Sequence, residues 1–160
     1  MATVLIADDD ADHRDLLTLA LLRCGHDVVE AADADAALRV VEAGGIDAVL
    51  LDIRMPGTSG IELCRLLRAG PATADLPIML VSADVNGHRI LAGMDAGADD
   101  FLAKPYQRAE LAARVTALLL RRERPSSKSA IAARTALLAA RAAVPRPVAV
   151  PVLMELSRTA

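Results

Sequence analysis

The stretch from residue 47 to residue 60 reads Asp-Ala-Val-Leu-Leu-Asp-Ile-Arg-Met-Pro-Gly-Thr-Ser-Gly. Its first half is an apolar run that closes on Asp52, which is typical of a buried strand with a polar carboxyl end. A proline and a glycine then mark a loop. Ser59 is followed three residues later by Glu62, the spacing of a capping box, so a helix is expected to begin there. The stretch is therefore predicted to form a strand, a loop and a helix in succession.

The same succession recurs along the first 122 residues. Short apolar runs predict strands, and apolar residues at helical spacing predict a helix after each strand. The expected strands are 3–7, a strand around 28–29, 47–52, 77–82 and 100–103, and the expected helices are 11–24, 33–43, one that begins at 59, 86–96 and 107–122. Apolar strands that alternate with helices indicate a parallel sheet covered on both faces. We therefore expect an α/β fold with a doubly wound, five-stranded parallel sheet.

The composition argues against several classes of protein. The net charge is −3, with 18 basic and 21 acidic residues, so a general nucleic-acid-binding surface is not expected. The N-terminus does not read as a signal peptide, and no apolar run reaches the roughly 18 residues of a membrane span. Cys24 and Cys64 lie in apolar helical patterns and are interpreted as two buried thiols. A cytoplasmic protein without a membrane segment is expected.

Polar side chains follow four of the five predicted strands, at the point where each strand ends. The acidic run 8–10 follows the first strand, Asp52 the third, Ser82 the fourth and Lys104 the fifth. In open α/β sheets the carboxyl ends of parallel strands meet at one edge, and ligands bind in the crevice there. These side chains are therefore expected to gather in one crevice.

The chemistry of that set favours phosphoryl transfer. Carboxylates that meet within a few ångströms repel one another unless a cation joins them, and hard oxygen ligands suit Mg²⁺. A carboxylate can attack phosphorus and form an aspartyl phosphate. A lysine ammonium supplies a point charge for the phosphate, and a serine hydroxyl donates a hydrogen bond to it. The strand ends together predict a carboxylate that accepts a phosphoryl group.

Four motifs carry a resemblance to a known family. They are Val-Leu-Ile-Ala-Asp-Asp-Asp at 4–10, Leu-Leu-Asp-Ile-Arg-Met-Pro-Gly-Thr-Ser-Gly at 50–60, Leu-Val-Ser-Ala at 80–83 and Gly-Ala-Asp-Asp-Phe-Leu-Ala-Lys-Pro-Tyr at 97–106. In order and spacing they resemble the receiver domain of two-component response regulators, over about residues 2–122. The resemblance implies a flavodoxin-like sheet with strand order 2-1-3-4-5. It also implies a phosphorylation-dependent signalling switch whose own activity is at most autophosphorylation and autodephosphorylation, so that the chain is not classed as an enzyme.

The resemblance assigns roles to the residues at the strand ends. Asp52 would be the phosphoacceptor, supplied by a sensor histidine kinase or a histidine phosphotransfer protein. The implied ligands of Mg²⁺ are oxygen atoms, from Asp8, Asp9, Asp52 and the backbone carbonyl of Arg54. Lys104 would pair with the phosphoryl group.

The resemblance also implies a switch on the fourth and fifth strands. Ser82 would move to hydrogen-bond the phosphate, and Phe101 would be the ring that turns inward when Ser82 moves. Ser82 stands where the family also uses Thr, and Thr58 and Ser59 stand where an apolar residue and Asp are common. Arg54 and Asp84 occupy positions that tend to tune dephosphorylation, and an altered lifetime of the phosphoryl group is the hypothesis here.

Several residues also have plain structural interpretations. Asp10 alone can cap the first helix, and the basic residues at 121, 122 and 124 complement the carboxyl end of the last helix. His13, His26 and His88 are scattered and are interpreted as surface residues rather than ligands. The Lys104–Pro105 pair suggests a fixed turn, for which a cis peptide bond is one form.

About 38 residues follow Arg122, and segment 123–160 is interpreted as a linker and an Ala- and Pro-rich C-terminal extension. The extension is expected to be helical or partly ordered, and a docking or dimerisation helix is the sharper alternative. A stand-alone receiver would signal through protein–protein contacts with a downstream target. A homodimer through the fourth helix, fifth strand and fifth helix, or through the tail, is considered as well.

Two other functions stay open at this point. A transcriptional regulator with a reduced or truncated DNA-binding output region is one, and specific DNA binding by the tail would support it. An aspartyl-phosphate phosphatase of the haloacid-dehalogenase type is the other. It would make Asp8 the nucleophile and leave Asp52 incidental, and the Lys104–Pro105 and Met55–Pro56 contexts argue against it.

Overall fold

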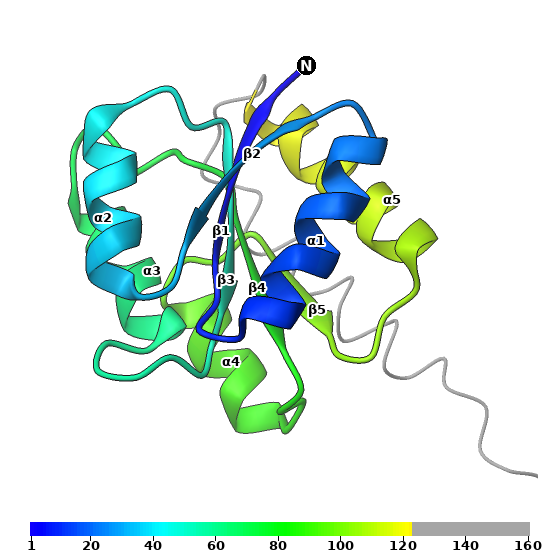
Figure 1. The fold of residues 1–160 in the computed structure, drawn as a ribbon. Helices are drawn as coiled ribbons and strands as arrows, with labels where there is room; N and C mark the ends of the chain where they lie inside the picture. The colour runs from blue at the N-terminus through cyan, green and yellow to red at the C-terminus, as the bar shows by residue number, and fades with distance from the viewer. Residues whose placement is uncertain (123–160) are drawn as a thin grey trace, which may run out of the picture.

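The computed structural model describes residues 1–122, and five parallel strands alternate there with five helices (Figure 1). The elements are β1 Thr3–Ala7, α1 Ala11–Arg23, β2 Asp27–Ala31, α2 Ala34–Ala43, β3 Ala48–Asp52, α3 Gly60–Ala69, β4 Ile78–Ser82, α4 Gly87–Asp95, β5 Asp100–Ala103 and α5 Arg108–Arg122. The sheet order is β2-β1-β3-β4-β5. The predicted fold class and strand order are confirmed, and the predicted elements that the structure describes shift by one or two residues at their ends.

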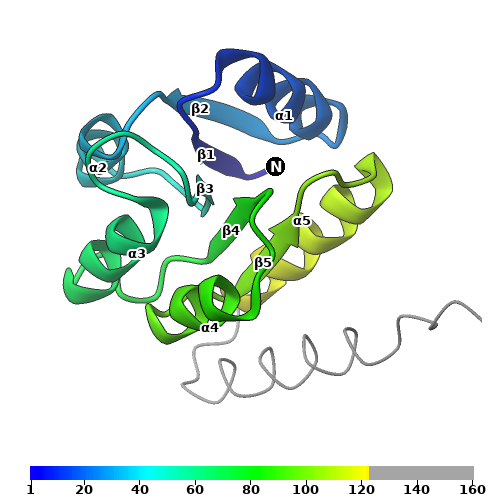
Figure 2. The ribbon, with the colours of Figure 1, turned by 90° about the horizontal axis from the view of Figure 1, so that it is seen from below.

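The helices form two layers on opposite faces of the sheet. Figure 2 shows α1 and α5 on one face and α2, α3 and α4 on the other. Successive strand residues point to opposite faces. Leu5, Leu51 and Leu80 accordingly pack on the α2–α4 side, while Ile6 and Leu50 pack on the α1–α5 side. This double burial explains why the central strands are apolar along their length.

Local capping sets where several helices begin. Asp10 accepts hydrogen bonds from the backbone N–H groups of Asp12 and His13 at the start of α1. Asp33 caps α2 as predicted, and Ser59 forms a full capping box with Glu62 at the start of α3. A cap satisfies N–H groups that have no partner inside the helix, and each is worth about 1 kcal/mol.

One prediction about the cysteines is wrong. Cys64 is buried within α3 as expected, but Cys24 is exposed. Cys24 is the C-cap residue of α1, with Gly25 at a φ of +83° directly after it. The helix has ended before Cys24, so the buried face of α1 does not extend to this residue.

Among residues 1–122, no helix is long and apolar enough to cross a membrane. The predictions for segment 123–160 lie outside the described residues.

Candidate functional site

Three carboxylates meet at the carboxyl edge of the sheet. Asp8 follows β1, Asp9 is the next residue, and Asp52 ends β3. Each offers one oxygen, and these atoms all lie within 4.8 Å of one another. Asp8 is 1% exposed and Asp52 is 8% exposed, whereas Asp9 is exposed to solvent. The sheet therefore brings together the acidic residues that follow two separate strands.

Lys104 places a positive charge between two of these carboxylates. Its Nζ lies 3.2 Å from Oδ2 of Asp8 and 3.6 Å from Oδ1 of Asp52. Its backbone N–H donates to the carbonyl of Ser82 at 2.8 Å, which ties the end of β5 to the end of β4. The Lys104–Pro105 peptide bond is cis. The lysine is thus shared between the two buried carboxylates.

The two buried carboxylates differ in their titration. Burial raises the pKa of Asp52 above its usual value, and the charge of Lys104 only partly opposes this effect. Burial also acts to raise the pKa of Asp8. It is outweighed there by hydrogen bonds from His13 and from the backbone of Asp10 and by the charge of Lys104, so the pKa is lowered. Asp8 is the better stabilised anion, and Asp52 is the more basic carboxylate.

The interpretation of His13 as a surface residue is wrong. Its side chain is 14% exposed, and its Nδ1 contacts Oδ2 of Asp8. Its Nε2 lies 2.7 Å from the hydroxyl of Tyr106. Sequence reasoning missed the contact with Tyr106 because Tyr106 is 93 positions away, and only the fold brings it to the first turn of α1. The contact with Asp8 joins residues only five positions apart, across the turn between β1 and α1.

The other two histidines differ from each other. His88 is exposed, as expected. His26 is partly buried, and its Nδ1 is buried without a hydrogen-bond partner. Neither His26 nor His88 is among the residues gathered at the acidic edge.

Ser82 and Phe101 both lie in the interior. Ser82 is 0% exposed, and its Oγ accepts a hydrogen bond from the backbone N–H of Asp84 at 3.1 Å. Phe101 is 3% exposed and belongs to the core on the α2–α4 side. The ring therefore occupies an inward position in this structure, and its expected turn with Ser82 stays a prediction.

Arg54 and Asp84 do not pair with each other. Arg54 is exposed, and its backbone hydrogen-bonds to the Asp52 carboxylate. Asp84 pairs with Arg89, whose Nε lies 3.4 Å from Oδ2 of Asp84, and it accepts a hydrogen bond from the Asn86 amide.

The backbone after β3 is held tightly against α3. Gly60 donates its N–H to the carbonyl of Ile53 at 3.0 Å. A Cβ at Gly60 would lie 2.1 Å from the backbone oxygen of Asp52. Only glycine fits such a close approach. The position of Asp52 therefore depends on this glycine, for which the sequence predicted only a place at the start of a helix.

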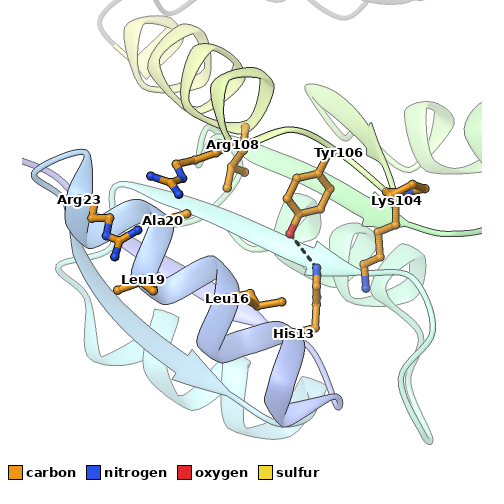
Figure 3. Close-up of a pocket in the computed structure, with 10 residues that line it drawn as sticks. His13, Leu16, Leu19, Ala20, Arg23, Lys104, Tyr106 and Arg108 are labelled. Atoms are coloured by element: carbon orange, nitrogen blue, oxygen red, sulfur yellow. Dashed lines mark hydrogen bonds between the residues drawn. The ribbon is translucent and has the colours of Figure 1, made fainter.

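A groove of about 360 Å³ lies between α1 and α5, next to the acidic edge. Figure 3 shows His13 and Lys104 near one end of it, with Tyr106 facing His13. Its lining joins apolar and cationic side chains, from His13, Leu16, Leu19, Ala20, Arg23, Lys104, Pro105, Tyr106, Arg108 and Leu111. Leu16 and Leu19 are 65% and 48% exposed, so apolar surface faces solvent here.

The acidic edge can hold a hard cation and stabilise a phosphoryl group. It offers three carboxylate oxygens within 4.8 Å of one another, and such a set of hard oxygen ligands suits Mg²⁺. It also offers one ammonium group already directed at the carboxylates. Asp52 is the carboxylate with the raised pKa, which favours it as a nucleophile over Asp8.

Comparisons with known proteins agree with this geometry. The model of the response regulator receiver domain family matches residues 4–116. The phosphate regulon transcriptional regulatory protein PhoB of Pseudomonas aeruginosa is 40% identical over 119 residues, which cover 74% of this chain and 52% of that protein. The chain thus spans about half the length of this curated relative.

Two solved structures share the fold. A response regulator from Chloroflexus aurantiacus has a TM-score of 0.72 and 38% identity, and the match covers 74% of this chain and 98% of that one. The receiver domain of a sensor histidine kinase from Pseudomonas aeruginosa has a TM-score of 0.69 and 29% identity, and the match covers 74% of this chain and 97% of that one. The latter structure has a magnesium ion coordinated in its active-site cleft.

Proposed function

The chain belongs to the response regulator receiver domain family, and from that membership we propose that it is switched by a phosphoryl group carried on Asp52. The observation that carries the proposal is the position of Lys104, whose ammonium lies 3.2 Å from Asp8 and 3.6 Å from Asp52. A phosphoryl group on Asp52 would add negative charge within reach of that ammonium. We place the domain boundary at residues 2–122.

The proposed reaction transfers a phosphoryl group from a phosphohistidine. A carboxylate oxygen of Asp52 forms the new P–O bond, the P–N bond of the donor breaks, and the electron pair returns to the donor imidazole. Asp52 is suited to the attack because burial raises its pKa. Asp8 is less suited because both of its oxygens accept hydrogen bonds, from Asp10 on one and from His13 and Lys104 on the other. This argues against the haloacid-dehalogenase alternative, in which Asp8 is the nucleophile.

The residues at the acidic edge fit Mg²⁺. Asp8, Asp9 and Asp52 would hold it through carboxylate oxygens, with the backbone carbonyl of Arg54 as a further ligand. When bound, the cation would neutralise charge on the phosphoryl oxygens during transfer. Lys104 would pair with the same oxygens.

Ser82 and Phe101 would carry the change away from the site. The Ser82 oxygen already accepts from the Asp84 backbone, so its own O–H proton remains to be donated to a phosphoryl oxygen. Phe101 lies on β5, three residues before Lys104, and packs in the core on the α2–α4 side. A shift of Ser82 toward the phosphoryl group would alter the packing around this ring.

The proposed phosphodonor is a sensor histidine kinase or a histidine phosphotransfer protein, which this chain would meet in the cytoplasm. The α1–α5 groove is a suitable contact surface for it, since exposed leucines lie beside Lys104 there. A downstream protein target is the proposed receiver of the signal. A role in transcription is the second candidate, because the curated relative PhoB is named a transcriptional regulatory protein and is about twice as long as the matched segment.

Phosphorylation of the full chain tests the proposal. The protein is incubated with acetyl phosphate and MgCl₂ and read by intact mass. We expect one labile phosphoryl adduct on the wild type and none on Asp52→Asn, which keeps the size of the side chain. Asp75→Asn, at an exposed position, is the matched control and should be labelled normally. An adduct that persists in Asp52→Asn would overturn the assignment.

A further inference from the structure

His13 connects the acidic edge to the α1–α5 groove. One ring nitrogen contacts Asp8, and the other lies 2.7 Å from the Tyr106 hydroxyl. The His13 and Tyr106 rings meet edge to face, with centroids 5.9 Å apart. The three residues come from the end of β1, the first turn of α1 and the loop before α5. They form a continuous chain of polar contacts between a carboxylate of the proposed cation site and the wall of the groove.

The direction of each hydrogen bond follows from the chemistry of the groups. A carboxylate only accepts, so Nδ1 of His13 carries the proton that it donates to Asp8. In a ring that carries its proton on Nδ1 alone, Nε2 is an acceptor, to which the Tyr106 hydroxyl can donate. Burial, followed by the charge of Asp8, raises the pKa of Tyr106 to about 12, which keeps this hydroxyl protonated.

The chain of contacts has little freedom to rearrange. Asp8 is 1% exposed, and the His13 side chain is 14% exposed. Asp8 is also fixed by the Asp10 backbone at 2.9 Å, and its own carbonyl accepts from Arg14 at 2.7 Å. Because little solvent reaches Asp8, a shift of its carboxylate is expected to move the His13 ring that contacts it.

Tyr106 and His13 are also two of the side chains that line the groove (Figure 3). Their hydrogen bond spans the groove from the loop before α5 to α1. The proposed function uses Asp8 and Lys104 but assigns nothing to His13 or Tyr106.

We propose that His13 is a positioning residue of the cation site, which holds the Asp8 carboxylate and transmits the loading of that site to Tyr106 in the groove. The proposal rests on the proposed function, because it takes Asp8 to be a ligand of the cation. Groups that hydrogen-bond to metal ligands fix their orientation, and their loss typically weakens metal binding by about 10-fold or more.

The first measurement is the affinity of the full chain for Mg²⁺, obtained by calorimetric titration with MgCl₂. We expect His13→Leu to bind about 10-fold more weakly than the wild type. His13→Asn should recover most of the affinity, because the Asn amide nitrogen can occupy the position of Nδ1 and donate to Asp8. His88→Asn, at an exposed position on α4, is the matched control and should not differ from the wild type.

The second measurement uses the emission of Tyr106. The chain has one Tyr and no Trp, so excitation near 280 nm reports on Tyr106 alone. We expect MgCl₂ to change this emission in the wild type and in His88→Asn. In His13→Asn the cation should still bind, yet the emission should no longer respond, because Asn is too short to reach the Tyr106 hydroxyl.

The outcomes separate this inference from the proposed function. If the wild type neither binds Mg²⁺ nor is labelled by acetyl phosphate, the proposed function fails and the inference with it. If the wild type binds and is labelled, but His13→Leu and His13→Asn match it in affinity and in Tyr106 response, only the inference is overturned. Should circular dichroism show that His13→Leu does not fold, the Tyr106 response of His13→Asn compared with that of the wild type tests the inference. A response equal to that of the wild type then overturns it.

Discussion

The ends of β1 and β3 each present a buried aspartate to the same edge, but the two are held in different ways. Asp8 is held by its side chain, through hydrogen bonds from Asp10, His13 and Lys104. Asp52 is held by its backbone, against which Gly60 packs so closely that no Cβ fits. Asp52 also has one ammonium at 3.6 Å and a backbone hydrogen bond from Arg54.

The pKa values of the two aspartates shift in opposite directions: the pKa of Asp8 is lowered and that of Asp52 is raised. A carboxylate surrounded by donors is a stable anion and a poor nucleophile. A carboxylate that is buried with fewer donors stays more basic, and a rigid backbone fixes its orientation. One edge of the sheet thus holds two aspartates with different properties: Asp8 is a firmly held anion, and Asp52 is the more reactive carboxylate.

The largest expected effect comes from the backbone that supports Asp52. Gly60→Ala places a methyl group 2.1 Å from the Asp52 carbonyl oxygen, so strand and helix must separate. We expect the free energy of unfolding, measured in urea, to fall by about 3 kcal/mol. Ser59→Ala, which removes only the helix cap next to it, should cost about 1 kcal/mol. Equal costs for the two variants would mean that the β3 end is not held by this contact.

The ammonium shared by the two carboxylates gives the next effect. Lys104→Met keeps an unbranched side chain of similar size but removes the ammonium group from Asp8 and Asp52. We expect the rate of labelling by acetyl phosphate to fall by about 100-fold, the usual effect of removing one charge-stabilising donor. Arg108→Met, at the groove beside it, is the control. A normal rate in Lys104→Met would remove the observation on which the proposed function depends.

The two aspartates should respond oppositely to neutralisation, measured by thermal unfolding with EDTA present. At pH 7, Asp8→Asn should lose about 2 kcal/mol because charge-assisted hydrogen bonds are lost. Asp52→Asn should instead raise the stability, because burial raises the pKa of Asp52 and its ionised form is unfavourable.

The pH dependence of that pair follows from the same pKa directions. The stabilisation by Asp8 is present above the ordinary pKa of 3.8 and is lost as the pH falls through its lowered folded value. The penalty from Asp52 is full above its raised folded pKa and disappears as the pH falls below the ordinary value. Changes of the same sign at pH 7 would contradict the distinction between the two strand ends.

The smallest effect concerns the lifetime of the phosphoryl group. Arg54 is exposed beside Asp52 and is not paired with Asp84. On the hypothesis that its side chain hinders the attacking water, Arg54→Asn should shorten the lifetime of the phosphoryl group several-fold. This corresponds to roughly 1 kcal/mol in the activation free energy of hydrolysis. The decay of the adduct is followed by intact mass, with Arg89→Asn as the control. An unchanged lifetime in Arg54→Asn would end this hypothesis.

Local patterns in the sequence were sufficient for most of the fold. The caps at Asp33 and Ser59 follow from spacing. The convergence of Asp8, Asp9, Asp52 and Lys104 follows from the rule that parallel strands share a carboxyl edge. These features need only neighbouring residues or a known sheet architecture.

The rest depended on contacts that no local pattern encodes. The pairing of His13 with Tyr106 joins residues 93 positions apart, and the sequence showed His13 only as one histidine among three. The need for glycine at position 60 arises from the distance between α3 and the end of β3, which becomes known only once the two are packed. Cys24 was misjudged because its helix had already ended.

The far edge of the sheet has a practical consequence for handling the protein. Arg121 donates to the carbonyl of Asp99, and Arg122 pairs with Asp47, so α5 ends beside the amino ends of β5 and β3. Met1 precedes β1 at this same edge, away from the carboxylates (Figure 1). A chip surface or a fluorescent tag attached at Met1 would therefore leave the acidic edge and the α1–α5 groove turned toward the solution, so that partners can be screened on immobilised protein.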